Sequence, residues 1–528
     1  MAQHHDTKQN LLQFIEIKSQ TIIVLSSFII LFVTLLPFDF SYPDSFSWND
    51  LKTIATTVSP PGDIAVNLVL FMPFGWGLAT LFSTKRFNLT KTILLTLIVS
   101  FSFSTTIEIL QIFLLLRRTT PTDVVNNSLS GVLGGVFFLL VRNRLKGCYF
   151  SFSKKLFLKI FLIVWLIYLI SIGWALISLK DATKLSNWEP QFPLMIGNEQ
   201  TGNRPWKGEM SYFYLSDRFL PQSIIEKFLT ADNQPQLLQD YLLGYYSFEE
   251  PKLQYFDQLG NLPSLIWQEK NIKKITKSAS SSIVLDENNW LQTEIPPKQL
   301  TKKVQNNSQF TIVTKIKSND KKQQGAARIF SLSENIYQRN LSLEQLGSDL
   351  KLRLRTTLTG NNGRNPELIL RNFFDDLAFH QIAIAYNAQQ LKIYLDSVEN
   401  IYTLKLNSEA AFFWSILYFM GSKTPIYMDK SKFYNFLYHN LLFMPFGFLL
   451  ALILIMSPKK KMSFLLIFLL GTILPSLIIE TILLLTDNAT GNLSYKLLDI
   501  PTIAITSLIF RALMTLKFKK NISPRFKL

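Results

Sequence analysis

The stretch Phe71-Met72-Pro73-Phe74-Gly75 occurs a second time in this chain, as Phe443-Met444-Pro445-Phe446-Gly447. A glutamate follows at the same distance in both places. Glu108 lies 37 residues after Phe71, and Glu480 lies 37 residues after Phe443. A motif and an acidic residue that recur together at one spacing indicate an internal repeat. The repeat decides the fold, because both copies lie in strongly apolar sequence.

Apolar segments around both copies predict a polytopic, α-helical membrane protein. The 528-residue chain is 48% hydrophobic and only 17% charged, whereas soluble proteins average about 25% charged residues. A bilayer core about 30 Å thick requires roughly 20 apolar residues in helical form. Eight segments have this character: Thr21–Phe38, Ile64–Phe82, Thr92–Leu116, Val124–Val141, Leu156–Leu179, Phe436–Met456, Met462–Thr486 and Ile500–Leu516.

Each copy is expected to form a three-helix membrane bundle, over residues 63–142 and 436–516. Asp123 opens the last helix of the first copy and Asp499 opens that of the second, with four extra residues in the second copy. Both copies would cross the membrane in the same sense, as parallel repeats. The other expected parts are a tail, first span and loop (1–62), a fifth span (156–179), an inserted region (180–408), a connector (409–435) and a basic tail (517–528).

Basic residues gather in the loops on one side of the predicted helices. Clusters of Lys and Arg follow the second, fourth, sixth and eighth spans. Loops of this kind stay in the cytoplasm. Both termini are therefore expected in the cytoplasm, and residues 180–435 on the outer side. Arg117 and Arg118 are the exception, since this orientation places them outside.

The inserted region, 180–408, has the pattern of an all-β antiparallel protein. Apolar and polar residues alternate in Gln309–Lys317, Asp349–Arg355 and Gln390–Leu395, as in strands with one buried face. Short strands at this spacing indicate a sandwich or jelly roll. Residues 221–238 are expected to be helix or loop. The aromatic stretch 410–420 is too short to span the bilayer and is expected to be interfacial or re-entrant.

Polar residues within the first copy form a candidate binding site, because polar and ionisable groups inside a bilayer are costly and usually functional. Glu108 and Gln111 share one helix face, and Asp123 and Asn127 share another. These groups are expected to converge in the outer half of the bilayer, where the arginines would pair with a carboxylate or an anionic ligand. The predicted binding residues are Asn67, Glu108, Gln111, Arg117, Arg118, Asp123, Asn126 and Asn127.

Each of these features also has a purely structural explanation. Arg117 and Asp123 would form an ion pair that locks two helices together. Asn126 and Asn127 would hydrogen-bond between helices. Asp123 would alternatively cap the N-terminus of its helix. The glycines at 131, 134 and 135 suit close packing of helices.

The first copy resembles the VanZ-like family of bacterial membrane proteins. The matching pattern is Asn67-x3-Phe71-x-Pro73-x-Gly75, Glu108-x2-Gln111, Arg117/Arg118 and Asp123-x2-Asn126-Asn127-x3-Gly131-x2-Gly134. The resemblance covers residues 63–141, with a weaker copy over 436–516. The family's founding member is associated with resistance to a glycopeptide antibiotic. The resemblance therefore implies an envelope protein of the bacterial cell (inner) membrane, without implying a defined reaction.

The second copy keeps only part of this pattern. His439 stands at the position of Asn67, and Leu483 stands at the position of Gln111. Thr502-Ile503 replaces the asparagine pair. An activity that requires the whole set is therefore expected in the first copy. The second-copy counterparts that stay polar are His439, Glu480 and Asp499.

The inserted region resembles the laminin-G-like, concanavalin-A-type sandwich. The stretch Trp206-x-Gly208, which comes last in the usual order, comes first here, and a circular permutation would explain this. The resemblance implies an exported domain that binds a glycan or a protein. The stretches that carry it include Tyr246–Glu250, Gln309–Ile312, Arg328–Ser333, Leu352–Thr356 and Ile393–Asp396.

Other function classes find less support in the sequence. Nucleic-acid binding is not expected despite a net charge of +17, because the basic residues flank apolar segments. The single cysteine, Cys148, and four scattered histidines predict neither a disulfide nor a metal site. No cofactor motif and no catalytic constellation is present.

The favoured function is a non-enzymatic envelope protein whose membrane core binds or moves an amphipathic or lipid-linked molecule. Its sandwich would engage a glycan or an envelope protein. Two alternatives remain. In one, the membrane part only anchors a scaffold or adhesion domain. In the other, Glu108 and Asp123 are an acid–base pair of a membrane enzyme that acts on lipid-linked sugars.

Overall fold

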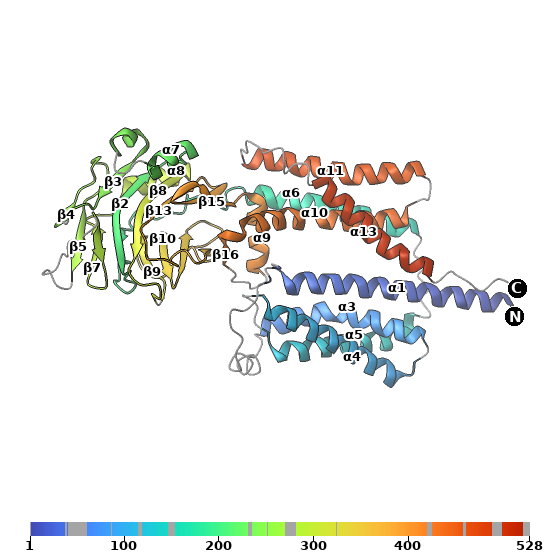
Figure 1. Ribbon diagram of the computed structural model, residues 1–528. Coiled ribbons are helices and arrows are strands. Elements are labelled where there is room, and N and C mark those ends of the chain that lie inside the picture. Colours follow the sequence, from blue (N-terminus) through green and yellow to red (C-terminus); the bar gives the residue numbers. More distant parts are fainter. Residues whose placement is uncertain are drawn as a thin grey trace. The chain divides into compact units, whose positions relative to one another are not determined.

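The chain divides into two compact units, residues 1–153 and 154–528, in a computed structural model. Each unit is described by itself below (Figure 1). The structure describes residues 2–36, 38, 40, 61–85, 87–114, 119–145, 154–230, 235–250, 252–269, 281–323, 325–419, 425–457, 461–487 and 499–520.

The first unit contains four helices, α1 (Ala2–Leu35), α3 (Pro61–Thr84), α4 (Leu89–Ile112) and α5 (Pro121–Leu145). α3 contacts the other three, and Figure 1 shows it running alongside them. Aromatic and aliphatic side chains from α1, α3 and α4 form one apolar core. Its buried members are Ile30, Leu35, Phe71, Phe74, Leu78, Ile107 and Leu114.

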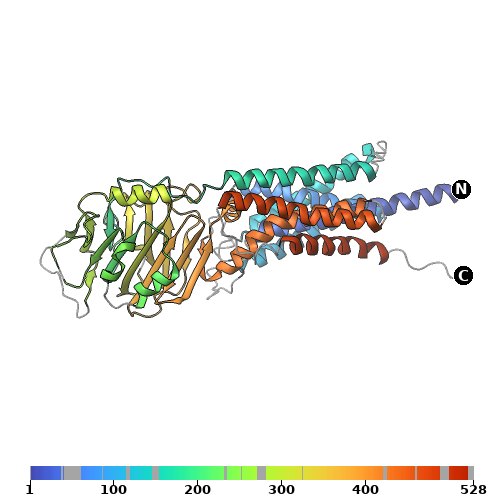
Figure 2. The same cartoon turned by 90° about the horizontal axis from the view of Figure 1, so that it is seen from above.

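The second unit repeats this arrangement with α6 (Lys154–Ser178), α10 (Ser431–Met456), α11 (Lys461–Asp487) and α13 (Asp499–Lys520). α10 packs against α6, α11 and α13, and the four helices run side by side in Figure 2. To the three helices predicted for each copy, the contacts thus add a fourth, α1 in one unit and α6 in the other.

The apolar cores of the two units use corresponding positions. Four buried residues of the first core recur 372 residues later in the second core. Burial at the same positions supports the internal repeat that the sequence predicts. The pairs are Phe71 and Phe443, Phe74 and Phe446, Leu78 and Leu450, and Ile107 and Ile479.

Glycine at the end of the repeated motif lets two helices meet closely in both units. A Cβ added to Gly75 would lie 1.7 Å from the carbonyl oxygen of Gly131 on α5. A Cβ added to Gly447 would lie 2.6 Å from the carbonyl oxygen of Ile503 on α13. Any larger residue would push the helices apart. These contacts agree with the close-packing role that glycine has between membrane helices.

Every segment predicted to cross the membrane lies largely within a helix of the described chain. Five helices in the described part of the chain are long and apolar enough to cross a bilayer: Leu89–Ile112, Pro121–Leu140, Leu158–Ser178, Met428–Met456 and Met462–Leu485. Ser19–Leu35 and Leu70–Thr84 are shorter apolar helices. Many large apolar side chains of these helices are exposed, for example Trp174 and Leu140. Such a surface is suited to lipid, so the protein is a membrane protein.

A large, almost entirely antiparallel β region lies between α6 and α10. One sheet has the strand order β16-β12-β11-β10-β9-β1-β7-β5-β4, and the other has β15-β14-β13-β8-β2-β3, with β6 also paired to β2. The first sheet consists of β16 (Ile426–Tyr427), β12 (Leu368–Leu370), β11 (Asp349–Leu354), β10 (Arg339–Leu346), β9 (Ala327–Ser333), β1 (Leu194–Ile196), β7 (Asn289–Thr293), β5 (Leu265–Glu269) and β4 (Gln254–Tyr255). The second consists of β15 (Ser397–Lys405), β14 (Gln390–Leu395), β13 (His380–Tyr386), β8 (Phe310–Ser318), β2 (Gly208–Ser216), β3 (Gly244–Ser247) and β6 (Ile283–Leu285).

The two sheets pack face to face (Figures 1 and 2). Phe213 of β2 contacts Phe330 of β9, with ring centroids 5.0 Å apart. The three predicted strands are β8, β11 and β14, with ends shifted by at most one residue. The region expected to be helix or loop forms α7 (Gln222–Thr230) and the 3₁₀ helix η1 (Pro235–Tyr241). α7 covers the outer face of the second sheet. The remaining helices there are α8 (Lys298–Asn307) and η2 (Met428–Lys430).

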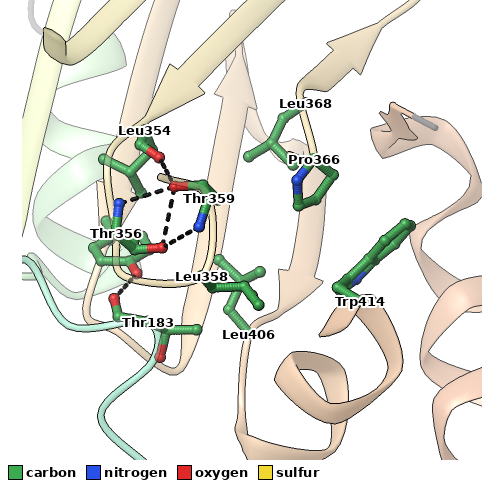
Figure 3. A pocket seen from close by; sticks show the side chains of 10 residues that line it. Thr183, Leu354, Thr356, Leu358, Thr359, Pro366, Leu368, Leu406 and Trp414 are labelled. Atoms are coloured by element: carbon green, nitrogen blue, oxygen red, sulfur yellow. Dashed lines mark hydrogen bonds between the residues drawn. The ribbon is translucent and has the colours of Figure 1, made fainter. Parts of the chain in front are cut away.

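The aromatic stretch after the sheets forms α9 (Ser408–Phe419), a helix of 12 residues. Trp414 of α9 lies beside Leu368 and Leu406 at one end of the sheets, around an apolar pocket of about 20 Å³ (Figure 3). A space of that size holds about one water molecule. The Trp414 indole N–H donates to the hydroxyl of Tyr438 on α10 at 2.9 Å. The sheets are therefore joined to α10 through a tightly packed helix.

Candidate functional site

The first turn of α5 gathers the polar groups of the first unit. Thr120 precedes Pro121, which is favoured at the first position of a helix because its missing N–H needs no partner there. The Thr120 hydroxyl donates to Asp123 Oδ2 at 2.9 Å and accepts the Asp123 N–H at 3.1 Å. This is a capping arrangement, in which a residue before the helix bonds to the third helical residue. Thr120, rather than Asp123, therefore caps α5.

Two other helices attach to this turn. The Asn67 amide of α3 donates to Asp123 Oδ1 at 2.9 Å. The buried Glu108 carboxylate of α4 accepts the backbone N–H of Thr120 at 3.0 Å. Asn67, Glu108 and Asp123, which the sequence places far apart, are thus brought together. Thr120 links the two acids.

Further along the helices, a second set of polar contacts follows. Asn127 of α5 donates to the hydroxyl of Ser104 on α4 at 2.9 Å. Among the described residues, Asn127 Oδ1 and the neighbouring Ser100 Oγ have no hydrogen-bond partner, and both are buried. Polar atoms of this kind are rare inside proteins. They leave acceptor and donor capacity between α4 and α5 that a bound polar group would satisfy.

The remaining predicted residues divide into two groups. Gln111 contacts a different neighbour, because its amide donates to the carbonyl of Thr34 on α1 at 2.8 Å. Asn126 is half-buried, and its backbone carbonyl accepts from Ser130 at 2.7 Å. Arg117 and Arg118 lie outside the described residues, so their predicted pairing stays a prediction.

The second unit builds its own polar cluster at the corresponding positions. Asn67 and Asp123 touch in the first unit, and their counterparts His439 and Asp499 form an ion pair in the second. The other ring nitrogen of His439 lies 3.5 Å from Glu409 Oε1. Asp499 is completely buried and His439 is 6% exposed. The second copy has therefore replaced a neutral amide with an ionisable ring held between two carboxylates.

Two more ionisable groups belong to this cluster. Glu480 of α11 interacts with the Asp499 carboxyl and lies within electrostatic reach of Glu409 and His439. Lys405, at the end of β15, interacts with Glu409 and Glu480. Burial lowers the pKa of Lys405, and these two carboxylates oppose the shift. The cluster thus receives one residue from each of α9, α10, α11, α13 and β15.

Three residues of these two polar clusters were not predicted from the sequence. Thr120 had a signal, because Thr120-Pro121-Thr122-Asp123 is a capping sequence followed by an apolar run. Glu409 and Lys405 had none. They belong to the connector and to the last strand, and only the three-dimensional path of the chain brings them to α10.

Comparison with known proteins gives one match. Residues 10–142 match the family model described as VanZ/LLP1. No curated protein and no solved structure matches the chain. A VanZ/LLP1 domain thus spans most of the first unit, and it includes most of α1 and of the three helices that carry the polar cluster.

Proposed function

We propose that the protein is a non-enzymatic, VanZ-like protein of the bacterial envelope whose first unit binds an amphipathic or lipid-linked molecule. The buried polar cluster between α3, α4 and α5 supports this most directly, because Asn127 Oδ1 and Ser100 Oγ lack partners within the described chain. Unsatisfied polar atoms are costly in a bilayer. A hydroxyl- or amide-bearing headgroup would satisfy them. A lipid-linked cell-wall precursor would also fit the glycopeptide-antibiotic association that the VanZ resemblance implies.

In this proposal the β region is an exported laminin-G-like sandwich that engages a glycan or an envelope protein. A groove of about 640 Å³ supports glycan binding. It lies at the end of the sheets where the chain enters from α6 and leaves to α9. Its volume lies within the usual range for ligand sites. Amide side chains, which hydrogen-bond well to sugar hydroxyls, dominate its walls. They come from Gln305, Asn306, Asn307, Gln309, Asn387, Gln389 and Asn407.

The proposal is tested by the lipids that the purified protein retains. Asn127→Leu removes the free acceptor and the bond to Ser104, so we expect the headgroup-bearing lipid bound by the wild type to fall about tenfold, the loss of roughly one hydrogen bond. Lipids extracted from the detergent-purified protein would be quantified by mass spectrometry. Thr106→Val is the control, since Thr106 lies on α4, the helix that carries Ser104, but is exposed.

Equal lipid retention in both variants would contradict binding at this cluster. It would favour the second candidate, a membrane-anchored scaffold. The contact between Glu108 and the Thr120 N–H favours that candidate, because it fixes the start of α5 without any ligand. Thermal unfolding of each variant in detergent would establish that the protein is intact.

A further inference from the structure

The second unit contains ionisable side chains that the proposed function does not use. Glu409, His439 and Asp499 form a continuous chain of contacts, with His439 in the middle. Glu480 interacts with Asp499, and Lys405 interacts with Glu409 and Glu480. α10 also packs against α6, which has no charged residue after Lys159. Within the described residues, Glu409 and Asp499 lie against His439, Glu480 interacts with it electrostatically, and Lys405 interacts with Glu409 and Glu480.

Two physical constraints act on this cluster. Like charges in contact and away from water cannot both persist, so the Glu480–Asp499 pair favours a shared proton over two carboxylates. An imidazole held between two carboxylates favours its protonated form for the opposite reason. The cluster therefore holds protons in more than one arrangement. Chains of Asp, Glu and His within membrane helices are the usual construction of proton relays.

In the first unit, the corresponding positions hold side chains that do not exchange a proton with Asp123. Asn67 donates to Asp123 at 2.9 Å, and an amide does not titrate. Thr120 supplies a hydroxyl and an N–H between the two acids of the first unit, whereas in the second unit Glu480 and Asp499 interact with each other. The replacement of Asn by His is thus the change that turns a fixed hydrogen bond into an exchangeable proton.

We propose that Glu409, His439, Glu480 and Asp499 form a proton-binding and proton-transfer site in the second unit. A proton on Glu409 passes to Nδ1 of His439, while the proton on the opposite nitrogen, Nε2, passes to Asp499 and is shared there with Glu480. Each O–H or N–H bond that breaks is replaced by one that forms, and no other reactant takes part. Because Glu409 and Lys405 belong to the segment next to the sheets, the proton enters from the sheet end of α10. This inference does not depend on what the first unit binds.

Infrared difference spectroscopy of the full-length protein in lipid nanodiscs tests the site. We expect a C=O band of a protonated carboxylic acid that disappears as the pH is raised across roughly pH 4 to 10, the range over which Asp, Glu and His titrate when perturbed. Glu480→Gln should abolish the band. His439→Asn, which introduces the residue that the first unit uses, should shift its midpoint by about one pH unit or more. Thr106→Val, at an exposed position of the first unit, is the control and should leave the band unchanged.

Two results would overturn the proposal. One is a wild-type protein without a titrating carboxylic-acid band. The other is a band that survives Glu480→Gln and does not move in His439→Asn. If Glu480→Gln fails to fold, the His439→Asn measurement still decides, because asparagine is already accommodated at the equivalent position.

Discussion

His380, on β13, makes the stability of the β region depend on pH. Its Nδ1 lies 2.7 Å from Asp396 Oδ2, and its Nε2 lies 2.8 Å from Asp376 Oδ1. The hydrogen bond to Asp396 is the main reason that the pKa of His380 rises to about 8, with Asp376 adding to it and burial opposing it. In the unfolded chain, the pKa of a histidine is about 6.5.

The direction of the pH dependence follows from this difference. A pKa that is higher in the folded state stabilises the protein fully below about pH 6.5, and this contribution is lost as the pH rises through about 8. We expect a loss of about 1 kcal/mol, because both aspartates are half-exposed and solvent weakens the interaction. Limited proteolysis of the full-length protein in urea would measure the urea midpoint at which the sheets unfold. This midpoint should fall as the pH is raised through about 8. His380→Gln should remove this slope, and an unchanged slope would contradict the assignment.

At the scale of single residues, the sequence located polar residues within the helices but not the residues that they contact. Glu480, Asp499 and His439 were recognisable as counterparts of first-copy residues, because spacing along a helix is preserved. The ion pair of His439 with Glu409 was not predictable, because Glu409 lies in a connector whose path depends on how the sheets end. Gln111 was predictable as a buried polar group. Its bond to Thr34 depends on where α1 packs.

Among the elements, the strands β9, β10 and β11 are joined by a buried charge network. Glu344 of β10 is completely buried, and three arginines surround its carboxylate. Arg328 lies 2.5 Å away, Arg339 lies 2.9 Å away and Arg353 lies 3.6 Å away, measured between charged atoms. Burial alone would raise the pKa of Glu344, but the three guanidinium groups lower it.

Removing the central carboxylate should therefore be costly. Glu344→Gln leaves the buried guanidinium groups without their common partner, and we expect a loss of about 3–5 kcal/mol in the free energy of unfolding of the sheets. Urea unfolding of the full-length protein would measure it. Glu367→Gln is the control, because Glu367 is closer to solvent and pairs with Arg353 and Lys351 at the edge of the network. Equal effects of the two variants would argue against a central role for Glu344.

The alternating pattern of the strands predicted their positions but not this network. Alternation identifies one buried face. Here both faces of the central strands are buried, since Leu341 and Leu343 lie on one side of β10 while Ser342 and Glu344 lie on the other. A charged residue in an alternating strand normally indicates the face of the strand that is exposed to solvent. The burial of Glu344 among three arginines of neighbouring strands has no local signature.

On the scale of the whole molecule, the order of elements explains where the β region was inserted. In the first unit, residues 36–60 connect α1 to α3. In the second unit, the chain between α6 and α10 contains both sheets and α9. Because α6 packs on α10 as α1 packs on α3, the sheets occupy the place of a connecting loop within the second unit. The sequence predicted an insertion between two three-helix copies, since α1 and α6 share no motif. Their equivalence rests on contacts alone.

An insertion at that loop makes a definite prediction about sidedness. If basic loops stay in the cytoplasm, Cys148 is internal and the β region is external. Cys148 lies outside the described residues and is the chain's only cysteine, so the wild type provides one thiol on the predicted inner side. Ser397→Cys, in a chain that also carries Cys148→Ser, provides one exposed thiol on β15. In spheroplasts, a membrane-impermeant maleimide should label the Ser397→Cys protein, and should label the wild type only after permeabilisation. Labelling of the wild type before permeabilisation would reverse the orientation, place Glu409 and Lys405 on the cytoplasmic side, and require protons to enter the second unit from the cytoplasm.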